Sequence, residues 1–199
     1  MPMRVIAGEL RGRPLAAPPG LATRPSAARL RETLFNLLGP LSGLSFLDGF
    51  AGSGAVGIEA YSRGARPVAF VESSAAATRV LRQNLERLGV AGAHLWQRPM
   101  AAALRALAQA PAAAARGGWD VVFLDPPYAD APGAPLLERL ATAPGLLHPS
   151  SRLVVETQRR QALPERAGRL RLARVHPQGD AQLAFYRIES EPAAPEAAN

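Results

Sequence analysis

A short motif, Asp125-Pro126-Pro127-Tyr128, directly follows four apolar residues, 121–124, that predict a buried strand. It combines a carboxylate, a carbonyl fixed by proline and an aromatic ring. An ionised Asp125 and the carbonyl of Pro126 could accept both N–H groups of an exocyclic base amine, so that the nitrogen turns its lone pair toward an incoming group. Tyr128 offers a flat face on which the base can stack. The motif therefore predicts a site that holds a base amine.

A purely structural role also fits this motif, with the aspartate capping a turn, the prolines ending the strand and the tyrosine packing on the core. For four residues taken alone, the structural role would be the better explanation. The context favours the chemical role, because the motif follows a fourth predicted strand and lies downstream of a glycine-rich loop. Residues at the carboxyl ends of parallel strands face the ligand crevice of an open sheet.

The glycine-rich loop has the pattern Gly52-x-Gly54-x-x-Gly57, directly after a predicted strand and at the start of a predicted helix. Glycines at this spacing allow a tight turn and let a ligand approach the backbone near the positive end of the helix. Glu72 ends the next predicted strand, where a carboxylate accepts hydrogen bonds from ribose hydroxyls. These features together predict a ligand that contains a nucleoside.

Asp48, just before the loop, narrows the choice of nucleoside. In a dehydrogenase this carboxylate would lie beside the pyrophosphate of NAD, an unfavourable contact between two anions. S-adenosylmethionine carries an ammonium, a sulfonium and no phosphate, so it suits the carboxylate. The chain also lacks a separate substrate domain with a recognisable acid or base for hydride transfer. We therefore favour a methyltransferase that uses S-adenosylmethionine over a dehydrogenase.

The apolar pattern alternates between strands and helices, which predicts a mostly parallel sheet with helices on both faces. The predicted strands are 44–50, 67–72, 93–97, 119–125, 151–157, 169–176 and 181–188. The predicted helices are one from Ser26 to a break at 39–40, then 55–64, 75–89, 100–110 and 134–143. The last two strands predict an antiparallel hairpin. The expected fold class is α/β, with a Rossmann-like, seven-stranded sheet and a small N-terminal β-hairpin within 3–17.

The N-terminal residues are strongly basic. All 23 basic residues of the chain are arginine, and six of them lie in the first 31 positions against the single acid Glu9: Arg4, Arg11, Arg13, Arg24, Arg29 and Arg31. On charge alone, a solvated surface and a polyanion partner explain this equally well; nucleic acid is preferred to membrane because no amphipathic apolar face accompanies the charge. We divide the chain into a hairpin that contacts RNA, 1–22, a methyltransferase domain, 23–188, and a disordered acidic tail, 189–199.

The composition excludes several other classes of protein. The 199-residue chain has no cysteine, hence neither disulfides nor thiolate metal sites, and its three histidines lack ligand spacing. No apolar run approaches the roughly 18 residues of a membrane span, and the N-terminus lacks the apolar stretch of a signal peptide. We expect a cytoplasmic protein that binds no metal, and a monomer, because no apolar stripe is left over.

Five segments together resemble the RsmD family: RVIAGELRGRPL, TRPSAARLRETLFNLLGPL, FLDGFAGSGAVGIEAYSRGA, VVFLDPPY and GDAQLAFYR. These are S-adenosylmethionine-dependent methyltransferases that modify the N2 amine of one guanine in small-subunit (16S) ribosomal RNA. The resemblance covers residues 3–187 and implies this activity on free RNA or on an assembling small subunit. It implies that Asp125, Pro126 and Tyr128 hold the guanine. It also implies RNA contacts from the six N-terminal arginines, and cofactor contacts from Asp48, Phe50, Gly52, Gly54, Glu72, Ser73 and Met100.

One departure from the family concerns the adenine of the cofactor. The family usually has an aspartate after the third strand, and Pro99 stands there, so backbone contacts such as the Met100 amide remain. Two other hypotheses stay open: an amino methyltransferase acting on adenine N6 of RNA or DNA, and a non-catalytic RNA-binding assembly factor. An acid in place of asparagine before Pro-Pro-Tyr favours guanine, because a carboxylate can also accept from the ring N–H of guanine.

Overall fold

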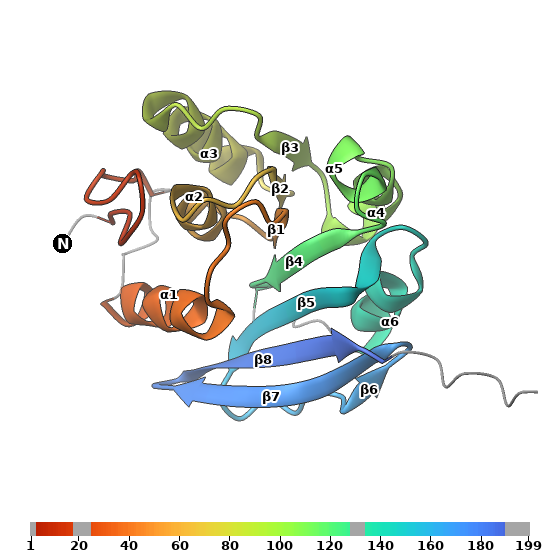
Figure 1. Cartoon of the computed structure of the whole chain (residues 1–199). Helices are drawn as coiled ribbons and strands as arrows, with labels where there is room; N and C mark the ends of the chain where they lie inside the picture. The colour runs from red at the N-terminus through yellow and green to blue at the C-terminus, as the bar shows by residue number, and fades with distance from the viewer. Residues whose placement is uncertain (1–2, 18–24, 128–133, 190–199) are drawn as a thin grey trace, which may run out of the picture.

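The computed structural model describes residues 3–17, 25–127 and 134–189. One eight-stranded sheet forms its centre, in the order β3-β2-β1-β4-β5-β8-β7-β6. Strands β1 to β5 pair in parallel, whereas β8, β7 and β6 add antiparallel strands on one side (Figure 1). The strand order reverses between β1 and β4, and an open α/β sheet forms its ligand crevice at such a point.

The bounds of the elements are as follows. The strands are β1 Phe46–Gly49, β2 Val68–Glu72, β3 His94–Gln97, β4 Trp119–Leu124, β5 Leu147–Gln158, β6 Arg166–Ala167, β7 Leu170–Gln178 and β8 Ala181–Ile188. The helices are α1 Pro25–Leu38, α2 Ala55–Ser62, α3 Ala75–Leu88, α4 Met100–Ala108, α5 Pro111–Ala114 and α6 Ala134–Thr142.

All seven predicted strands are present, and the predicted α/β class with its C-terminal antiparallel hairpin is confirmed. The eighth strand, β6, has only two residues, too few to show any alternation in the sequence. The alanine-rich residues after α4 form α5, a helix of four residues. These differences lie away from the carboxyl ends of β1, β4 and β5, where the predicted site residues gather.

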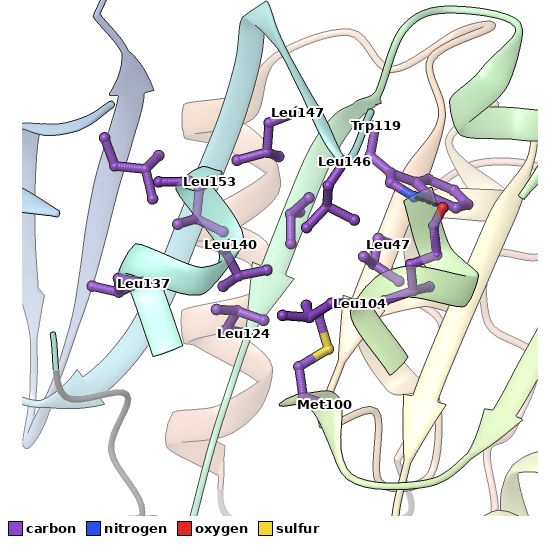
Figure 2. Close-up of a cluster of buried hydrophobic side chains, with 14 of the residues drawn as sticks. Leu47, Met100, Leu104, Trp119, Leu124, Leu137, Leu140, Leu146, Leu147 and Leu153 are labelled. Atoms are coloured by element: carbon purple, nitrogen blue, oxygen red, sulfur yellow. Dashed lines mark hydrogen bonds between the residues drawn. The ribbon is translucent and has the colours of Figure 1, made fainter. Parts of the chain in front are cut away.

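Helices cover both faces of the sheet. Helices α1, α2 and α3 lie on one side and α4, α5 and α6 on the other (Figure 1). Successive strand residues point to opposite faces, so Phe123 of β4 joins the buried cluster under α1–α3 and Leu124 joins the cluster under α4–α6. Figure 2 shows the second cluster, with Leu104 of α4 and Leu140 of α6 near Leu124. Each buried leucine contributes about 1.5–3 kcal/mol, and these layers fix the strands whose ends form the site.

The predicted N-terminal hairpin is shorter than expected and is bound to the domain by buried polar groups. A single bridge links Arg4 and Pro14. The carboxylate of Glu59, on the fully buried part of α2, accepts hydrogen bonds from the backbone N–H groups of Ile6 and Ala7 at 2.7 and 3.0 Å. This segment therefore forms part of the surface of the methyltransferase domain.

Asn84 of α3 connects the end of the N-terminal segment with the glycine-rich loop. Its side chain is fully buried, accepts from the N–H of Ala16 at 2.8 Å and donates to the carbonyl of Ala16 at 3.0 Å. The same amide group donates to the carbonyl of Ser53 at 2.9 Å. One side chain thus fixes the predicted RNA-contacting segment against the predicted cofactor loop.

Among the described residues, no helix combines the length and the apolar character that crossing a membrane requires. Apart from Glu189, the tail predicted to be disordered lies outside the described residues. Glu189 itself pairs with Arg166 of β6 and Arg171 of β7, so the described chain ends against the outer antiparallel strands.

Candidate active site

The candidate site lies where β1, β4 and β5 end. Parallel pairing places Leu124 beside Val155, and the next residues along these two chains are Asp125 and Glu156. Strand alternation directs both carboxyl groups toward the face covered by α1–α3, and Asp48 of β1 belongs to the same face. The topology therefore brings together three carboxyl groups that lie far apart in the sequence.

The glycine-rich loop is bound to the end of β2. The N–H groups of Phe50 and Ala51 both donate to the carbonyl of Val71 at 2.9 Å, and the N–H of Gly52 donates to the Glu72 carboxylate at 2.7 Å. Phe50 has a φ of 70°, a left-handed conformation that is uncommon for residues other than glycine. Backbone of this kind persists where its surroundings fix it, and it gathers at ligand sites.

The three glycines of the loop serve different purposes. A side chain at Gly54 would collide with Leu81 of α3, and a side chain at Gly57 would collide with the ring of Phe70. These two glycines therefore allow α2 and α3 to pack closely on β2. Gly52 has a φ of 55°, and a Cβ there would have no neighbour within 4 Å. The space above Gly52 is open, as a ligand that approaches the backbone requires.

Asp48 is a buried carboxyl that organises the start of α2. It is 2% exposed and accepts a hydrogen bond from the N–H of Gly57 at 2.8 Å. Burial is the largest cause that raises the pKa of Asp48 to about 7; the Gly57 hydrogen bond opposes this rise, and the charges of Asp125 and Glu72 contribute to it. A positively charged ligand would favour the ionised form of this group.

Glu72 orders the loop before any ligand arrives. Its two oxygens accept from the N–H groups of Gly52 and Ser74, both at 2.7 Å. Ser74 in turn caps α3 by accepting from the N–H of Ala77 at 3.3 Å, while Ser73 is exposed beside it. A carboxylate has about four lone-pair sites, so Glu72 retains capacity for ribose hydroxyls.

Asp125 and Pro126 directly follow β4, at its carboxyl end. The backbone N–H of Asp125 donates to the carbonyl of Gly49 at 3.4 Å, which holds the motif to β1. Asp125 keeps an exposed surface, yet protein atoms surround its carboxyl group, and this desolvation raises its pKa to about 6. Pro126 is buried and Pro127 exposed. Tyr128, the predicted stacking residue, lies outside the described residues.

Glu156 was not predicted as a site residue, and the register of β5 places it beside Asp125. Burial raises the pKa of Glu156 to about 8, and the neighbouring charge of Asp125 contributes to the rise. In the sequence, the only signal was an acid that ends the apolar run 153–155 of a strand. Only the pairing of β4 with β5 in the folded chain shows that this acid lies near Asp125.

The structure places Met100 at the start of α4 with its side chain 2% exposed, inside the cluster shown in Figure 2. Only its backbone can therefore face a ligand. The same packing explains Gly49, because a Cβ there would lie 2.7 Å from Leu124 and 3.1 Å from the sulfur of Met100. Pro99 immediately precedes α4 and has no polar side chain or N–H.

The predicted RNA-contacting arginines differ in exposure. Arg4, Arg11, Arg13 and Arg29 are exposed, and Arg24 lies outside the described residues. Arg31 is 6% exposed; its guanidinium donates to the carbonyl of Arg4 at 2.6 Å and lies 3.8 Å from the carboxylate of Glu59. A guanidinium in this position supports the N-terminal segment from inside, so we leave Arg31 out of the proposed RNA surface.

Four carboxyl groups of the candidate site have no positive partner in the described part of the chain. Within the ranges that the structure describes, no arginine or histidine forms a salt bridge with Asp48, Glu72, Asp125 or Glu156. The sulfonium and ammonium of S-adenosylmethionine would supply this positive charge, and the open space above Gly52 would admit it. The residues present therefore fit this cofactor.

The sheet order and the glycine-rich loop define the class of protein: this is the Rossmann-like fold of the S-adenosylmethionine-dependent methyltransferases. A family model described as "Conserved hypothetical protein 95" matches residues 3–187. The chain belongs to this family, the RsmD family.

Individual relatives resemble the chain over most of its length. The Bacillus subtilis (strain 168) protein YlbH, provisionally named an rRNA methyltransferase, is 36% identical over 187 residues, which cover 93% of this chain and 98% of YlbH. "Ribosomal RNA small subunit methyltransferase D" of Escherichia coli (strain K12) is 33% identical over 193 residues, 95% of this chain and 91% of its own. A solved structure from Escherichia coli, yhhF, provisionally described as a methyltransferase, has a TM-score of 0.79 at 32% identity and covers 96% of this chain and 100% of that chain.

Proposed function

We propose that this protein transfers a methyl group from S-adenosylmethionine to the exocyclic N2 amine of a guanine in small-subunit (16S) ribosomal RNA. The observation that carries the proposal is the position of Asp125 and Pro126 at the end of β4, beside the glycine-rich loop. The name of the Escherichia coli relative supports ribosomal RNA as the substrate. The carboxylate chemistry at Asp125 and the family resemblance support guanine.

The amine requires two hydrogen-bond acceptors before it can react. Its lone pair is delocalised into the purine ring, so the nitrogen is a weak nucleophile. In the proposed complex, the Asp125 carboxylate accepts one N2–H and the carbonyl of Pro126 accepts the other, which frees the lone pair. S-adenosylmethionine would supply the electrophilic methyl group, its S–CH3 bond breaking so that S-adenosylhomocysteine leaves. As the new N–C bond forms, the surplus proton of N2 passes to an oxygen of Asp125, and the rigid prolines hold both acceptors in place beforehand.

The cofactor would be held by groups that the structure already orders. Glu72 would accept from the ribose hydroxyls. Asp48 favours the positively charged methionine end, because its carboxyl group is buried and has no cationic partner among the described residues. The loop backbone from Phe50 to Gly54 would line the ligand. The backbone at Met100 would contact the adenine, since its side chain is buried and Pro99 offers no acid.

The RNA would be held by stacking and by phosphate contacts. We retain Tyr128 as the proposed stacking partner of the base, a contact worth about 1–3 kcal/mol. The exposed arginines of the N-terminal segment and α1, namely Arg4, Arg11, Arg13 and Arg29, would contact phosphates and provide affinity without sequence information. We propose that a monomer acts in the cytoplasm, on free RNA or on an assembling small subunit.

The direct test of the catalytic assignment is the variant Asp125→Asn, which keeps the shape of the side chain and removes its charge. We expect methyl transfer to ribosomal RNA to fall about 10²–10³-fold, comparable with the loss of one preorganised group in other active sites. Calorimetry should show little change in cofactor affinity. Asp180→Asn, at the exposed turn between β7 and β8, is the matched control. Activity of Asp125→Asn within twofold of the unchanged protein would remove Asp125 from the mechanism.

A further inference from the structure

Glu156 has no role in the mechanism above, although it lies next to the group that holds the amine. Val155 pairs with Leu124, and Glu156 and Asp125 are the next residues of the two chains, near enough for the charge of Asp125 to contribute to the raised pKa of Glu156. The residues two places earlier, Phe123 and Val154, both lie in the cluster under α1–α3. The two carboxyl groups therefore point to the same face of the sheet.

The surroundings of Glu156 do not explain a carboxylate. Its partner on β8 is Leu183, which is fully buried and apolar. Among the described residues, Glu156 has no salt-bridge partner. A buried carboxyl group beside apolar side chains lowers the stability of a fold unless hydrogen bonds satisfy it. We expect a ligand bound next to the glycine-rich loop and Asp125 to supply the missing hydrogen-bond donors.

We infer that Glu156 accepts the ring N1–H of the target guanine while Asp125 and Pro126 hold its N2 amine. Glu156 is then the residue that selects guanine over adenine. This inference rests on the proposed function and adds to it the group that reads the base.

The donor pattern of the base supports this assignment. Guanine presents N1–H and its N2 amine side by side on one edge, so two carboxyl groups on adjacent strands match two neighbouring sets of donors. Adenine has an unprotonated ring nitrogen at N1. This nitrogen is an acceptor, and it would face an oxygen of the ionised Glu156 carboxylate, which is also an acceptor. Sites built to bind an N–H or O–H reject analogues that lack it far more strongly than apolar pockets reject a missing methylene.

The empty site holds a proton that the guanine complex does not need. Glu156 faces Asp125 on β4, and Asp48 on β1 and Glu72 on β2 add negative charge to the same crevice. With its pKa raised to about 8 by burial and by Asp125, Glu156 holds a proton at neutral pH when the site is empty. The N–H groups of guanine favour the ionised carboxylate, because hydrogen bonds to the charged form lower a pKa.

The test uses two bases that share the N2 amine and differ at N1. The guanine modified by the unchanged protein is located by mass spectrometry, and the ribosomal RNA is rebuilt by ligation with guanine or 2-aminopurine at that position. 2-Aminopurine has the amine and lacks both N1–H and the C6 carbonyl oxygen, so the contact at N1 is isolated by comparing the preference with and without the Glu156 carboxylate. We expect the unchanged protein to prefer guanine by about 10²-fold or more in kcat/KM.

The variant Glu156→Gln should reduce that preference at least tenfold. Its amide oxygen accepts N1–H of guanine more weakly than a carboxylate does, whereas its amide N–H can donate to the bare N1 of 2-aminopurine, so the two activities move closer together. Calorimetric binding of S-adenosylmethionine should be unchanged. Glu86→Gln, on the exposed side of α3, is the matched control and should keep the full preference.

Two results would overturn the inference and leave the proposed function intact. One is equal turnover of the guanine and 2-aminopurine RNAs by the unchanged protein, a measurement that depends on no variant. The other is an equal loss on both bases in Glu156→Gln, which would indicate a merely structural residue. Absence of N2-methylguanosine from the reaction of the unchanged protein would instead refute the proposed function itself.

Discussion

At the scale of single residues, the crevice is marked by carboxyl groups whose pKa values burial has raised. Asp125 and Glu156 are neighbours, so their titrations belong to the pair. Burial raises the pKa of Asp125 to about 6, and burial together with the neighbouring charge of Asp125 raises the pKa of Glu156 to about 8. Asp48, with a pKa of about 7, faces the same crevice. The pair accepts donors fully only after both protons have left.

This order of ionisation predicts the pH dependence of the reaction. For acids with raised pKa values the ionised, accepting forms appear as pH rises, so kcat/KM should increase between about pH 6 and 8. In Glu156→Gln the upper step near 8 should disappear while the step near 6 remains. Initial rates of label transfer across this range give both profiles. A Glu156→Gln profile that still rises to pH 8 would show that the upper step belongs to another group.

The site residues that the sequence predicted are those that directly end a strand or lie in the glycine-rich loop. Asp125 and Glu72 follow apolar runs, and the end of a parallel strand faces the crevice whatever the detailed register. Glu156 also follows an apolar run, but its partner is identified only by the pairing of β4 with β5. The burial of Arg31 depends in the same way on Glu59 of another helix.

At the scale of elements, different glycines of the glycine-rich loop serve packing and ligand binding. Gly54 and Gly57 leave room for Leu81 and Phe70, whereas Gly52 faces open space with a φ of 55°. Gly89, which ends α3, also has a left-handed backbone, a φ of 64°, and no neighbour near its Cβ position. Gly52 and Gly89 therefore differ chiefly in whether a ligand is expected to approach them.

We predict that Gly52→Ala and Gly89→Ala lower the free energy of unfolding by a similar amount, about 1–2 kcal/mol, because both place alanine in a left-handed backbone. Only Gly52→Ala should weaken binding of S-adenosylmethionine, by tenfold or more. Denaturant unfolding and calorimetry measure the two effects separately. Equal cofactor affinity in the two variants would mean that the ligand does not approach Gly52.

Elements with a strong apolar pattern were predictable, and those that depend on distant partners were not. The seven predicted strands each contain an apolar run or alternation long enough to detect, whereas the two residues of β6 do not. The predicted N-terminal hairpin is present as a short antiparallel pairing around the bridge between Arg4 and Pro14, but its dependence on Glu59 and Asn84 of the domain was not predicted. Such buried polar contacts leave no periodic pattern in a sequence.

At the scale of the whole molecule, the net charge of +7 matters less than where the positive charges lie. Exposed arginines of the N-terminal segment lie on a part of the chain that Asn84 ties to the glycine-rich loop. A substrate held by its phosphates on this segment would be anchored to the same side chain that supports the cofactor loop. Affinity from such contacts depends strongly on salt.

We therefore predict that replacing Arg11 and Arg13 together by glutamine weakens RNA-dependent turnover and leaves cofactor binding intact. The plot of log affinity against log salt has a negative slope, and its magnitude should decrease by about 1.5, as expected for two lost phosphate contacts. The matched control replaces Arg79 and Arg82, two exposed arginines of α3. Equal loss of RNA and cofactor binding, or an equal effect of the control pair, would contradict this assignment.

The most direct test of the central claim identifies the product. Ribosomal RNA and small subunits from cells that lack the protein are each incubated with purified protein and methyl-labelled S-adenosylmethionine, then digested to nucleosides for mass spectrometry. We predict labelled N2-methylguanosine, and the better substrate will show the stage of subunit assembly at which the protein acts. Label in N6-methyladenosine would contradict the guanine assignment and identify an adenine methyltransferase. No label in either substrate, together with no calorimetric cofactor binding, would indicate an RNA-binding protein on a methyltransferase fold.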